Sequence, residues 1–169
     1  MFVSGIPFLV TFSRKIRMLT TEYVPSRTAQ QIANSLTKIF NTYARRGFVV
    51  DLALMDMEFE KLRDKLSIVE VNTTASREHV PEIERQIRLI KERVRCTTSE
   101  FPFNPVPRLV LIHAFYTCVM WLNDIPRKSG AVQGISPREL VIGRTENYKR
   151  LSGLYGRLCG SQYVRDRHE

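Results

Sequence analysis

The sequence lacks any apolar run as long as a membrane helix, and it is poor in cysteine. No uninterrupted apolar stretch reaches the roughly 20 residues that a membrane-spanning helix needs, so we expect a soluble protein. The three cysteines, Cys96, Cys118 and Cys159, lie far apart and form no close CxxC-type pair. The spacing therefore supports neither a zinc site nor a disulfide framework. We expect each cysteine to be a small buried residue of a protein in a reducing compartment.

Acidic residues are scarce relative to basic ones. The chain has 26 Lys and Arg against 17 Asp and Glu, a formal net charge of +9, and the C-terminal quarter is the basic part. Such a balance favours an anionic partner, and nucleic acid is the common one. The alternative is a basic fragment of a longer polyprotein whose acidic neighbours lie elsewhere.

The opening apolar run, Phe2–Phe12, has the length of a secretory signal core but lacks its flanks. Its positive charges follow the run rather than precede it, and no small-residue cleavage pattern comes after it. We therefore predict a strand there. The stretches Ile6–Ser13 and Ile16–Val24 are rich in β-branched residues and predict an antiparallel hairpin.

The rest of the chain alternates helical and strand patterns. Ser26 or Thr28 suits the cap of a helix that ends at Gly47. The further predicted elements are a buried strand at Phe48–Met55, a short helix at Glu58–Leu66, a strand at Ile68–Asn72, a long helix from about Pro81 to Arg95, a buried helix at Arg108–Asn123 and a short helix at Ser136–Ile142. This order predicts an α/β domain in which helices cover a mixed sheet.

Asp56 directly follows the predicted strand Phe48–Met55. An open α/β sheet places its site beyond the carboxyl ends of its strands, which makes Asp56 a candidate catalytic residue. A carboxylate at this position also suits the N-terminus of the short helix that follows. The residue alone leaves catalysis and capping equally open.

The long helix carries a column of side chains that begins with an acid and continues with bases. At about 100° per residue, the stripe expected to be buried consists of Ile83, Ile87, Ile90 and Val94. Glu84 lies to one side of this stripe, and its column continues with Arg88, Lys91 and Arg95. Glu82 lies on the other side. A carboxylate at the edge of a core can hold a divalent metal while cations along the helix contact phosphates. The alternative is a solvated face with a Glu84–Arg88 ion pair.

Two histidines have different surroundings in the sequence. His113 is flanked by apolar residues, which predicts a core position rather than a ligand. His79 lies in the loop before the long helix, a place from which its side chain is able to approach a site.

Two motifs, ERxxRxxxExxR from Glu84 to Arg95 and SPRELVIG from Ser136 to Gly143, resemble those of copia-type (Ty1/copia, Pseudoviridae-like) retrotransposon integrases. The spacing ERxxRxxxExxR, from Glu84 to Arg95, resembles the helix that carries the catalytic Glu of that family. Ser136–Gly143, SPRELVIG, is similar to the SPxELxxG signature that follows the family's core. Both motifs occur in the family's order, behind a strand that ends in Asp56, and the resemblance extends from the hairpin to about Gly143.

The resemblance implies a ribonuclease-H-like fold, with a mixed five-stranded sheet flanked by helices, over residues 1–125 and a basic post-core segment over 126–169. It implies an Asp, Asp, Glu triad that holds Mg²⁺, with Mn²⁺ as a substitute, for attack of water or a DNA 3′-hydroxyl on a phosphodiester. By position, Asp56 is expected as the second Asp and Glu84 as the Glu. The residues expected to bind DNA are Arg85, Arg88, Lys91 and Arg95.

The chain departs from the family pattern in two places. The first Asp belongs shortly before a segment like Phe2-Val3, where this chain begins, so we expect an incomplete or inactive core. The 27 residues between Asp56 and Glu84 form a shorter interval than is usual, and Glu82 is the reserve candidate for the catalytic Glu.

The resemblance also implies the setting in which the protein acts. The expected partners are DNA, as element ends and target, and further copies of the chain, in a nuclear or cytoplasmic particle without a membrane. The alternative function is a non-catalytic nucleic-acid-binding or assembly module derived from an integrase. The Ser136–Gly143 signature disfavours a different ribonuclease-H-like nuclease.

Overall fold

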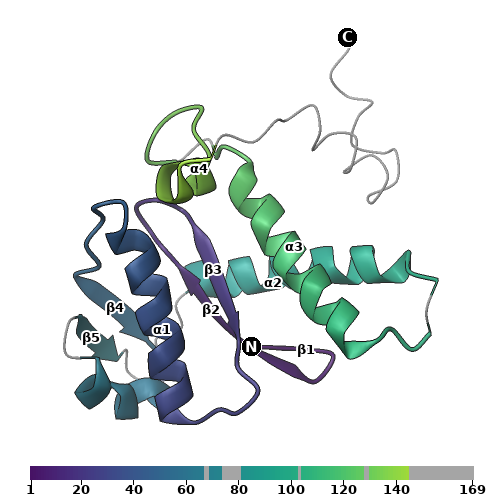
Figure 1. Cartoon of the computed structure of the whole chain (residues 1–169), viewed down its shortest axis with the longest axis horizontal. Coiled ribbons are helices and arrows are strands. Elements are labelled where there is room, and N and C mark those ends of the chain that lie inside the picture. The colour runs from purple at the N-terminus through teal and green to yellow at the C-terminus, as the bar shows by residue number, and fades with distance from the viewer. Residues whose placement is uncertain (67–68, 74–80, 103, 128–129, 145–169) are drawn as a thin grey trace. The chain divides into compact units, whose positions relative to one another are not determined.

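The computed structural model describes residues 1–66, 69–73, 81–102, 104–127 and 130–144 (Figure 1). The chain divides into two compact units, Met1–Arg88 and Leu89–Glu169. The boundary predicted after residue 125 stays a prediction. None of the helices within the described ranges is long and apolar enough to cross a membrane.

The first unit begins with a three-stranded antiparallel ladder. β1 (Phe2–Val3) pairs with β2 (Ile6–Phe12), which pairs with β3 (Leu19–Tyr23). Ser4 and Gly5 connect β1 to β2 with φ angles of 48° and 77°, the left-handed values of a tight hairpin turn. The hairpin predicted from the sequence is therefore confirmed, and the opening run is two strands rather than one.

The helix α1 (Ala29–Ala44) follows the ladder. Its N-cap is Thr28, whose Oγ1 accepts a hydrogen bond from the Gln31 amide at 3.3 Å. Of the two caps suggested by the sequence, the structure uses this one. Burial on the inner face of α1 raises the pKa of Tyr43 to about 12, and the Ser13 side chain opposes part of this increase.

The second ladder is parallel and shorter than predicted. β4 (Leu52–Met55) pairs with β5 (Glu70–Thr73). The 3₁₀-helix η1 (Met57–Lys65) lies between the two strands in the sequence. The strand predicted to begin at Phe48 begins four residues later, because the Phe48 amide donates to the Tyr43 carbonyl and closes the end of α1. β4 is also not fully buried, since Leu52 is 48% exposed.

The two ladders share one core but do not form the predicted five-stranded sheet. Within the described residues, the strands form the orders β1-β2-β3 and β4-β5. The core cluster that joins them to α1 and η1 contains Ala33, Leu36, Leu62, Leu66 and Val71. Leu9 of β2 and Met55 of β4 pack against it, and Figure 1 shows α1 beside both ladders. The mixed α/β class is confirmed, whereas the single sheet is not observed.

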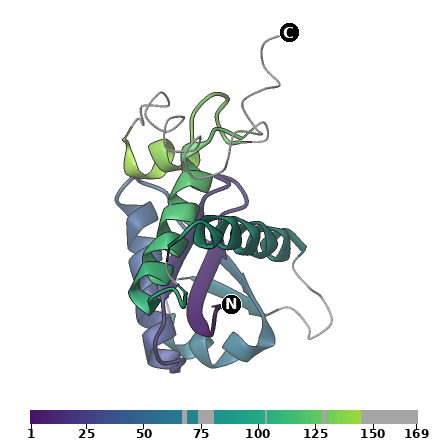
Figure 2. The ribbon, with the colours of Figure 1, turned by 90° about the vertical axis from the view of Figure 1, so that its right-hand side faces the viewer.

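Helices make up the described part of the second unit. α2 (Pro81–Ser99) begins in the first unit and is one continuous helix in the side view of Figure 2. Within the second unit, Thr97 of α2 lies 3.6 Å from the sulfur of Cys118 on α3 (Arg108–Asp124). Cys118 is buried as predicted, but Cys96 is exposed, which contradicts the prediction for that cysteine. Cys159 lies outside the described residues.

The segment Ser136–Gly143 forms the short helix α4 (Pro137–Ile142) and its caps. The Ser136 hydroxyl accepts from the Glu139 amide at 3.1 Å, and Gly143 ends the helix with a φ of 75°. Arg138 Nη1 lies 3.0 and 3.1 Å from the two carboxylate oxygens of Asp124, a residue that is 1% exposed at the end of α3. The motif therefore caps α4 and attaches it to α3.

Candidate functional site

Asp56 lies at the carboxyl end of β4, where the sequence placed it. It occupies the N-cap position of η1, but its side chain makes no capping hydrogen bond and the residue is exposed. The neighbouring side chains, Met55 and Phe59, pack against the core cluster. The Phe59 amide donates to the Asp56 carbonyl at 2.9 Å. The backbone is thus fixed on both sides while the carboxylate faces solvent, which favours a ligand role over a cap.

The two acids at the start of α2 have different surroundings. Glu82 Oε2 accepts a hydrogen bond from Nε of Arg14, and Glu82 Oε1 lies 3.9 Å from Nη1 of Arg17. Both arginines belong to the turn between β2 and β3. Glu84 is exposed on the helix surface. Two guanidinium groups compensate the charge of Glu82, and Glu84 is the acid that the helix motif marks, so Glu84 stays the candidate for a metal ligand.

The buried stripe of α2 is rotated relative to the prediction. Its most buried members are Gln86, Ile90, Val94 and Thr97, with exposures of 8%, 0%, 1% and 6%. Ile83 and Ile87, which were predicted to be buried, are only partly so. Apolar periodicity could not predict this rotation, because two of the buried residues are polar. The buried face of α2 therefore includes Gln86 and lies farther from the column that begins at Glu84 than the sequence predicted.

The column that begins at Glu84 is accessible to solvent, as a nucleic-acid-binding face requires. Arg85, Arg88 and Arg95 are exposed and Lys91 is partly buried. These are the four cations that the motif resemblance marks for DNA binding. Their accessibility is compatible with that role and equally with a solvated helix face.

Asp56 and Glu84 belong to the same compact unit, Met1–Arg88. The residues 74–80 that precede α2, including His79, lie outside the described ranges. Within the ranges that are described, no three His, Cys, Asp or Glu side chains lie close enough together to hold a metal ion. Glu58, the acid next to Asp56 along η1, forms an ion pair with Arg27 at 2.9 Å. The structure thus offers separate carboxylates rather than a formed cluster.

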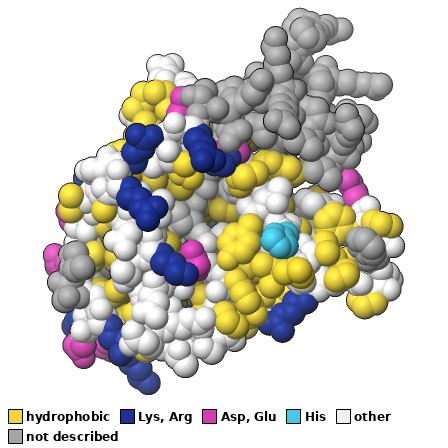
Figure 3. Space-filling view, viewed as in Figure 1, with side chains coloured by type: hydrophobic (Ala, Val, Ile, Leu, Met, Phe, Trp, Pro, Cys, Tyr) yellow, Lys and Arg dark blue, Asp and Glu magenta, His cyan; other side chains and the backbone are white. Residues whose placement is uncertain are grey.

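His113 does not lie in the core, in contrast to the prediction. It is exposed on α3, on the same side as Leu109 and Met120, which are 65% and 36% exposed. Figure 3 shows hydrophobic side chains gathered around a histidine on this surface. The prediction failed because α3 is apolar around most of its circumference, so apolar neighbours in the sequence do not reveal which face is buried.

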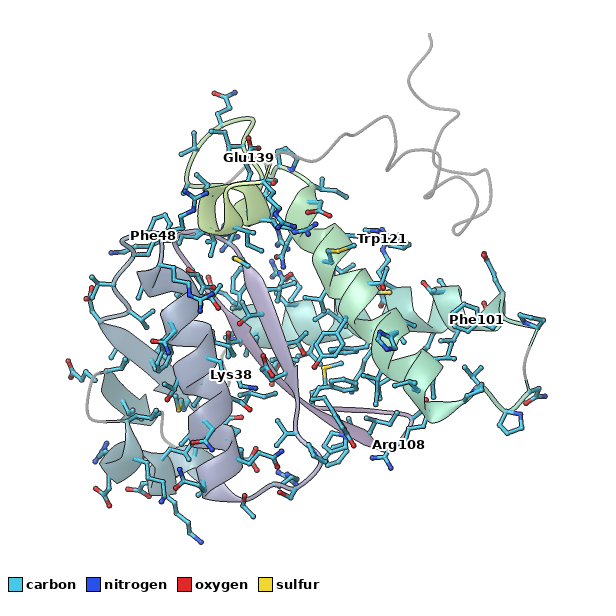
Figure 4. All side chains as sticks on the ribbon, viewed as in Figure 1. Lys38, Phe48, Phe101, Arg108, Trp121 and Glu139 are labelled. Carbon is cyan, nitrogen blue, oxygen red and sulfur yellow. The ribbon has the colours of Figure 1, made fainter. Side chains whose placement is uncertain are left out.

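Figure 4 shows other side chains of the two units. In the first unit, Lys38 lies on α1, and its Nζ is 3.8 Å from the Glu22 carboxylate of β3. In the second unit, Arg108 lies at the start of α3 and Trp121 near its end. Trp121 is 6% exposed and belongs to the packed side of the helix.

No protein-family model matches the chain, and a search of curated proteins finds no relative. Among solved structures, the chain is similar to the catalytic core domain of BIV integrase, with a TM-score of 0.55 at 16% identity. The similarity covers 89% of this chain and 91% of that domain. The chain therefore has the ribonuclease-H-like fold of an integrase catalytic core.

Proposed function

We propose that the chain is an integrase-type core of copia character that acts on DNA phosphodiesters with a divalent metal. The observation that carries this proposal is the position of Asp56 at a strand end of an integrase-core fold, with a solvent-facing carboxylate that does not cap η1. Glu84 supports it, since it lies on the exposed surface of α2.

Asp56 and Glu84 fit the chemistry of Mg²⁺, with Mn²⁺ as a substitute. Mg²⁺ keeps several waters and is commonly bound by one or two carboxylates together with substrate phosphates. Two exposed carboxylates and a DNA phosphate make such a donor set. A bound metal would supply charge stabilisation at the attacking and leaving oxygens. The chain itself holds the metal and orients the DNA.

The basic column is proposed to contact the DNA backbone. Arg88, Lys91 and Arg95 follow Glu84 in this column, and Arg85 lies beside it. A duplex held by these four cations would have its phosphates along α2. Such contacts position the nucleic acid without reading its sequence. They also make the affinity fall with salt, because each neutralised phosphate releases counterions.

A second copy of the chain is the proposed partner of the exposed side of α3. From Leu109 to Asn123 the helix carries no Lys, Arg, Asp or Glu, although the chain has a net charge of +9. An apolar face of this kind lets two copies meet without like-charge repulsion, and a twofold interface needs the same patch on both partners. Leu109 and Met120 mark this face.

The alternative function is a DNA-binding or assembly module without catalysis. It has specific support, since Arg88 and Arg95 of the basic column are exposed whether or not Asp56 holds a metal. In that case Glu84 would only weaken phosphate binding by repulsion. Glu84→Gln would then leave DNA affinity unchanged or increase it, both with Mg²⁺ and with EDTA.

The proposed function is tested by fluorescence anisotropy with a labelled DNA duplex, in Mg²⁺ and in EDTA. We expect binding that falls steeply with salt and that is tighter in Mg²⁺. Asp56→Asn should remove the gain from Mg²⁺ and leave the binding in EDTA intact. Absent or salt-independent DNA binding would contradict the proposal, and binding that Mg²⁺ does not change would favour the non-catalytic module.

A further inference from the structure

We propose that Arg27 is a phosphate-binding residue beside Asp56 that contacts the DNA strand held there. Phe2 and Glu58 hold its guanidinium in place. The proposal rests on the proposed binding of DNA, and it adds a cation from outside α2. Arg27 lies in the connection between β3 and α1, and all four residues belong to the unit Met1–Arg88.

The contact between Arg27 and Glu58 places a cation close to Asp56. Nη2 of Arg27 donates to Oε2 of Glu58 at 2.9 Å. Glu58 follows Asp56 by two residues, so their Cα atoms are no more than about 7.6 Å apart, because consecutive Cα atoms are separated by about 3.8 Å. Duplex DNA carries one negative charge for about every 1.7 Å of its axis. A strand with one phosphate at Asp56 therefore has further phosphates within reach of Arg27.

Phe2 provides an aromatic surface for the guanidinium. The guanidinium carbon of Arg27 lies 5.4 Å from the centroid of the Phe2 ring, within the range of a cation–π contact. Phe2 pairs with Pro7 in the hairpin of β1 and β2, so the backbone that carries the ring is fixed. The N–H donors of a guanidinium lie in its own plane, so a contact with its face orients the arginine without blocking those donors.

The backbone on both sides of Arg27 is also fixed. The Ser26 amide and hydroxyl both donate to Oε1 of Gln31, at 2.9 and 2.6 Å. Thr28 is the N-cap of α1, and its carbonyl accepts from the Ile32 amide at 3.1 Å. A cation on a fixed frame loses less conformational freedom on binding than a cation on a loose loop. The frame of Arg27 is therefore formed before a phosphate binds.

The Arg27–Glu58 pair is able to exchange with a phosphate. The two side chains are 56% and 54% exposed, and an exposed ion pair contributes little to stability. η1 is attached to α1 without this pair, through the core cluster and through Lys65, whose Nζ donates to Oε1 of Gln30 at 3.0 Å. Arginine commonly binds a phosphate through two parallel N–H groups. A DNA phosphate can therefore take Arg27 from Glu58 without detaching η1.

The test measures the affinity of the full chain for a labelled DNA duplex in Mg²⁺ as the salt concentration rises. Arg27→Ala removes the proposed contact, Glu58→Gln removes its partner, and Arg46→Ala is the matched control. Arg46 is an exposed arginine beyond the other end of α1, a helix about 24 Å long. Thermal melts check that each variant is folded, and Arg27→Gln replaces Arg27→Ala if that variant is unfolded.

We expect Arg27→Ala to weaken DNA binding and to reduce the slope of log K against log salt by about 1, since one phosphate contact is lost. Arg46→Ala should keep the slope of the unmodified chain. Glu58→Gln should bind DNA as tightly as the unmodified chain or more tightly, because Arg27 no longer has to leave a carboxylate. Equal losses in Arg27→Ala and Glu58→Gln would show that the pair only supports the fold. An Arg27→Ala variant that behaves like Arg46→Ala would overturn the contact.

The position of the contact is tested by repeating Arg27→Ala in the Asp56→Asn background. We expect the change to cost less affinity there than in the unmodified chain, because two groups that hold the same part of the DNA do not act independently. An equal cost in both backgrounds would place Arg27 away from the phosphate at Asp56 and overturn the proposal. DNA binding that responds to Asp56→Asn but not to Arg27→Ala would overturn this inference alone, whereas an unmodified chain that does not bind DNA would contradict the proposed function as well.

Discussion

Nε of Arg14 donates a hydrogen bond to Oε2 of Glu82, and this contact joins a turn and a helix start that lie 68 residues apart in the sequence. The contact distinguishes the two acids at the beginning of α2, because only Glu82 pairs with this turn in the contacts described above. Glu82 is held by the β2–β3 turn, whereas Glu84 is exposed on the surface that carries the basic column. Asp56 and Glu84 are therefore the candidate metal ligands, and the exposed arginines of α2 are the candidate DNA contacts.

The Arg14–Glu82 pair should contribute little to stability. Both side chains are exposed, by 56% and 43%, and exposed ion pairs typically contribute about 0–1 kcal/mol. We expect Glu82→Gln to lower the free energy of unfolding by less than about 1 kcal/mol in urea titrations. A much larger loss would show that the contact is needed to form the first turn of α2, rather than only to orient it.

The ion pair between Arg138 and Asp124 should matter far more. Asp124 is 1% exposed, and removal of one partner from a buried ion pair typically costs about 3–5 kcal/mol. We expect Arg138→Met to destabilise the chain by roughly this amount in urea titrations. Arg144→Met, which changes an exposed arginine just after α4, is the control.

This comparison also tests the meaning of the SPRELVIG motif. The structure assigns Ser136, Arg138 and Gly143 to capping α4 and attaching it to α3. An Arg138→Met variant as stable as Arg144→Met would contradict this assignment. In that case the motif arginine would be available for DNA.

The stability of the chain should fall in alkaline solution through Tyr43. Burial raises its pKa from 10 to about 12, so the unfolded chain loses this proton first as the pH rises. The stabilisation is fully present below pH 10 and is lost between about pH 10 and 12, up to about 2.7 kcal/mol. We expect Tyr43→Phe to reduce this pH dependence in urea titrations relative to the unmodified chain. Equal pH dependence in Tyr43→Phe and in the unmodified chain would contradict the role of Tyr43.

The exposed side of α3 should support self-association. We expect the double variant Leu109→Lys, Met120→Lys to shift sedimentation velocity profiles toward a smaller species, because it places charge in an apolar interface. Val49→Lys is the matched control, since Val49 is apolar and 81% exposed on the other unit. The same profile for both variants, or a monomeric unmodified chain, would contradict this interface.

Local patterns in the sequence predicted the helices and the hairpin well, because amphipathic periodicity and capping residues act over a few positions. The same patterns failed where a contact outside their range decides the structure. The Phe48 amide closes α1 and delays β4, and Gln86 is buried although it is polar. His113 was misplaced because the sequence of α3 does not distinguish its two faces.

The candidate site, like the fold, could be predicted where local patterns decide it and not where a distant contact does. Asp56 and Glu84 could be proposed from a strand end and a motif, since both are local features. The contacts of Glu82 with Arg14 and Arg17 could not be predicted, because no periodicity relates a turn to a helix so far along the chain. A run of cations in a predicted hairpin turn was the available signal, and it became informative once its partner was known.

The most direct test of the account is Mn²⁺ binding followed by electron paramagnetic resonance, with the full chain and a DNA duplex. We predict that Asp56→Asn and Glu84→Gln each weaken Mn²⁺ binding strongly, because each removes one carboxylate ligand. Glu82→Gln should bind Mn²⁺ as the unmodified chain does. Mn²⁺ binding that survives both Asp56→Asn and Glu84→Gln, or that is lost equally in Glu82→Gln, would contradict the assignment of the site.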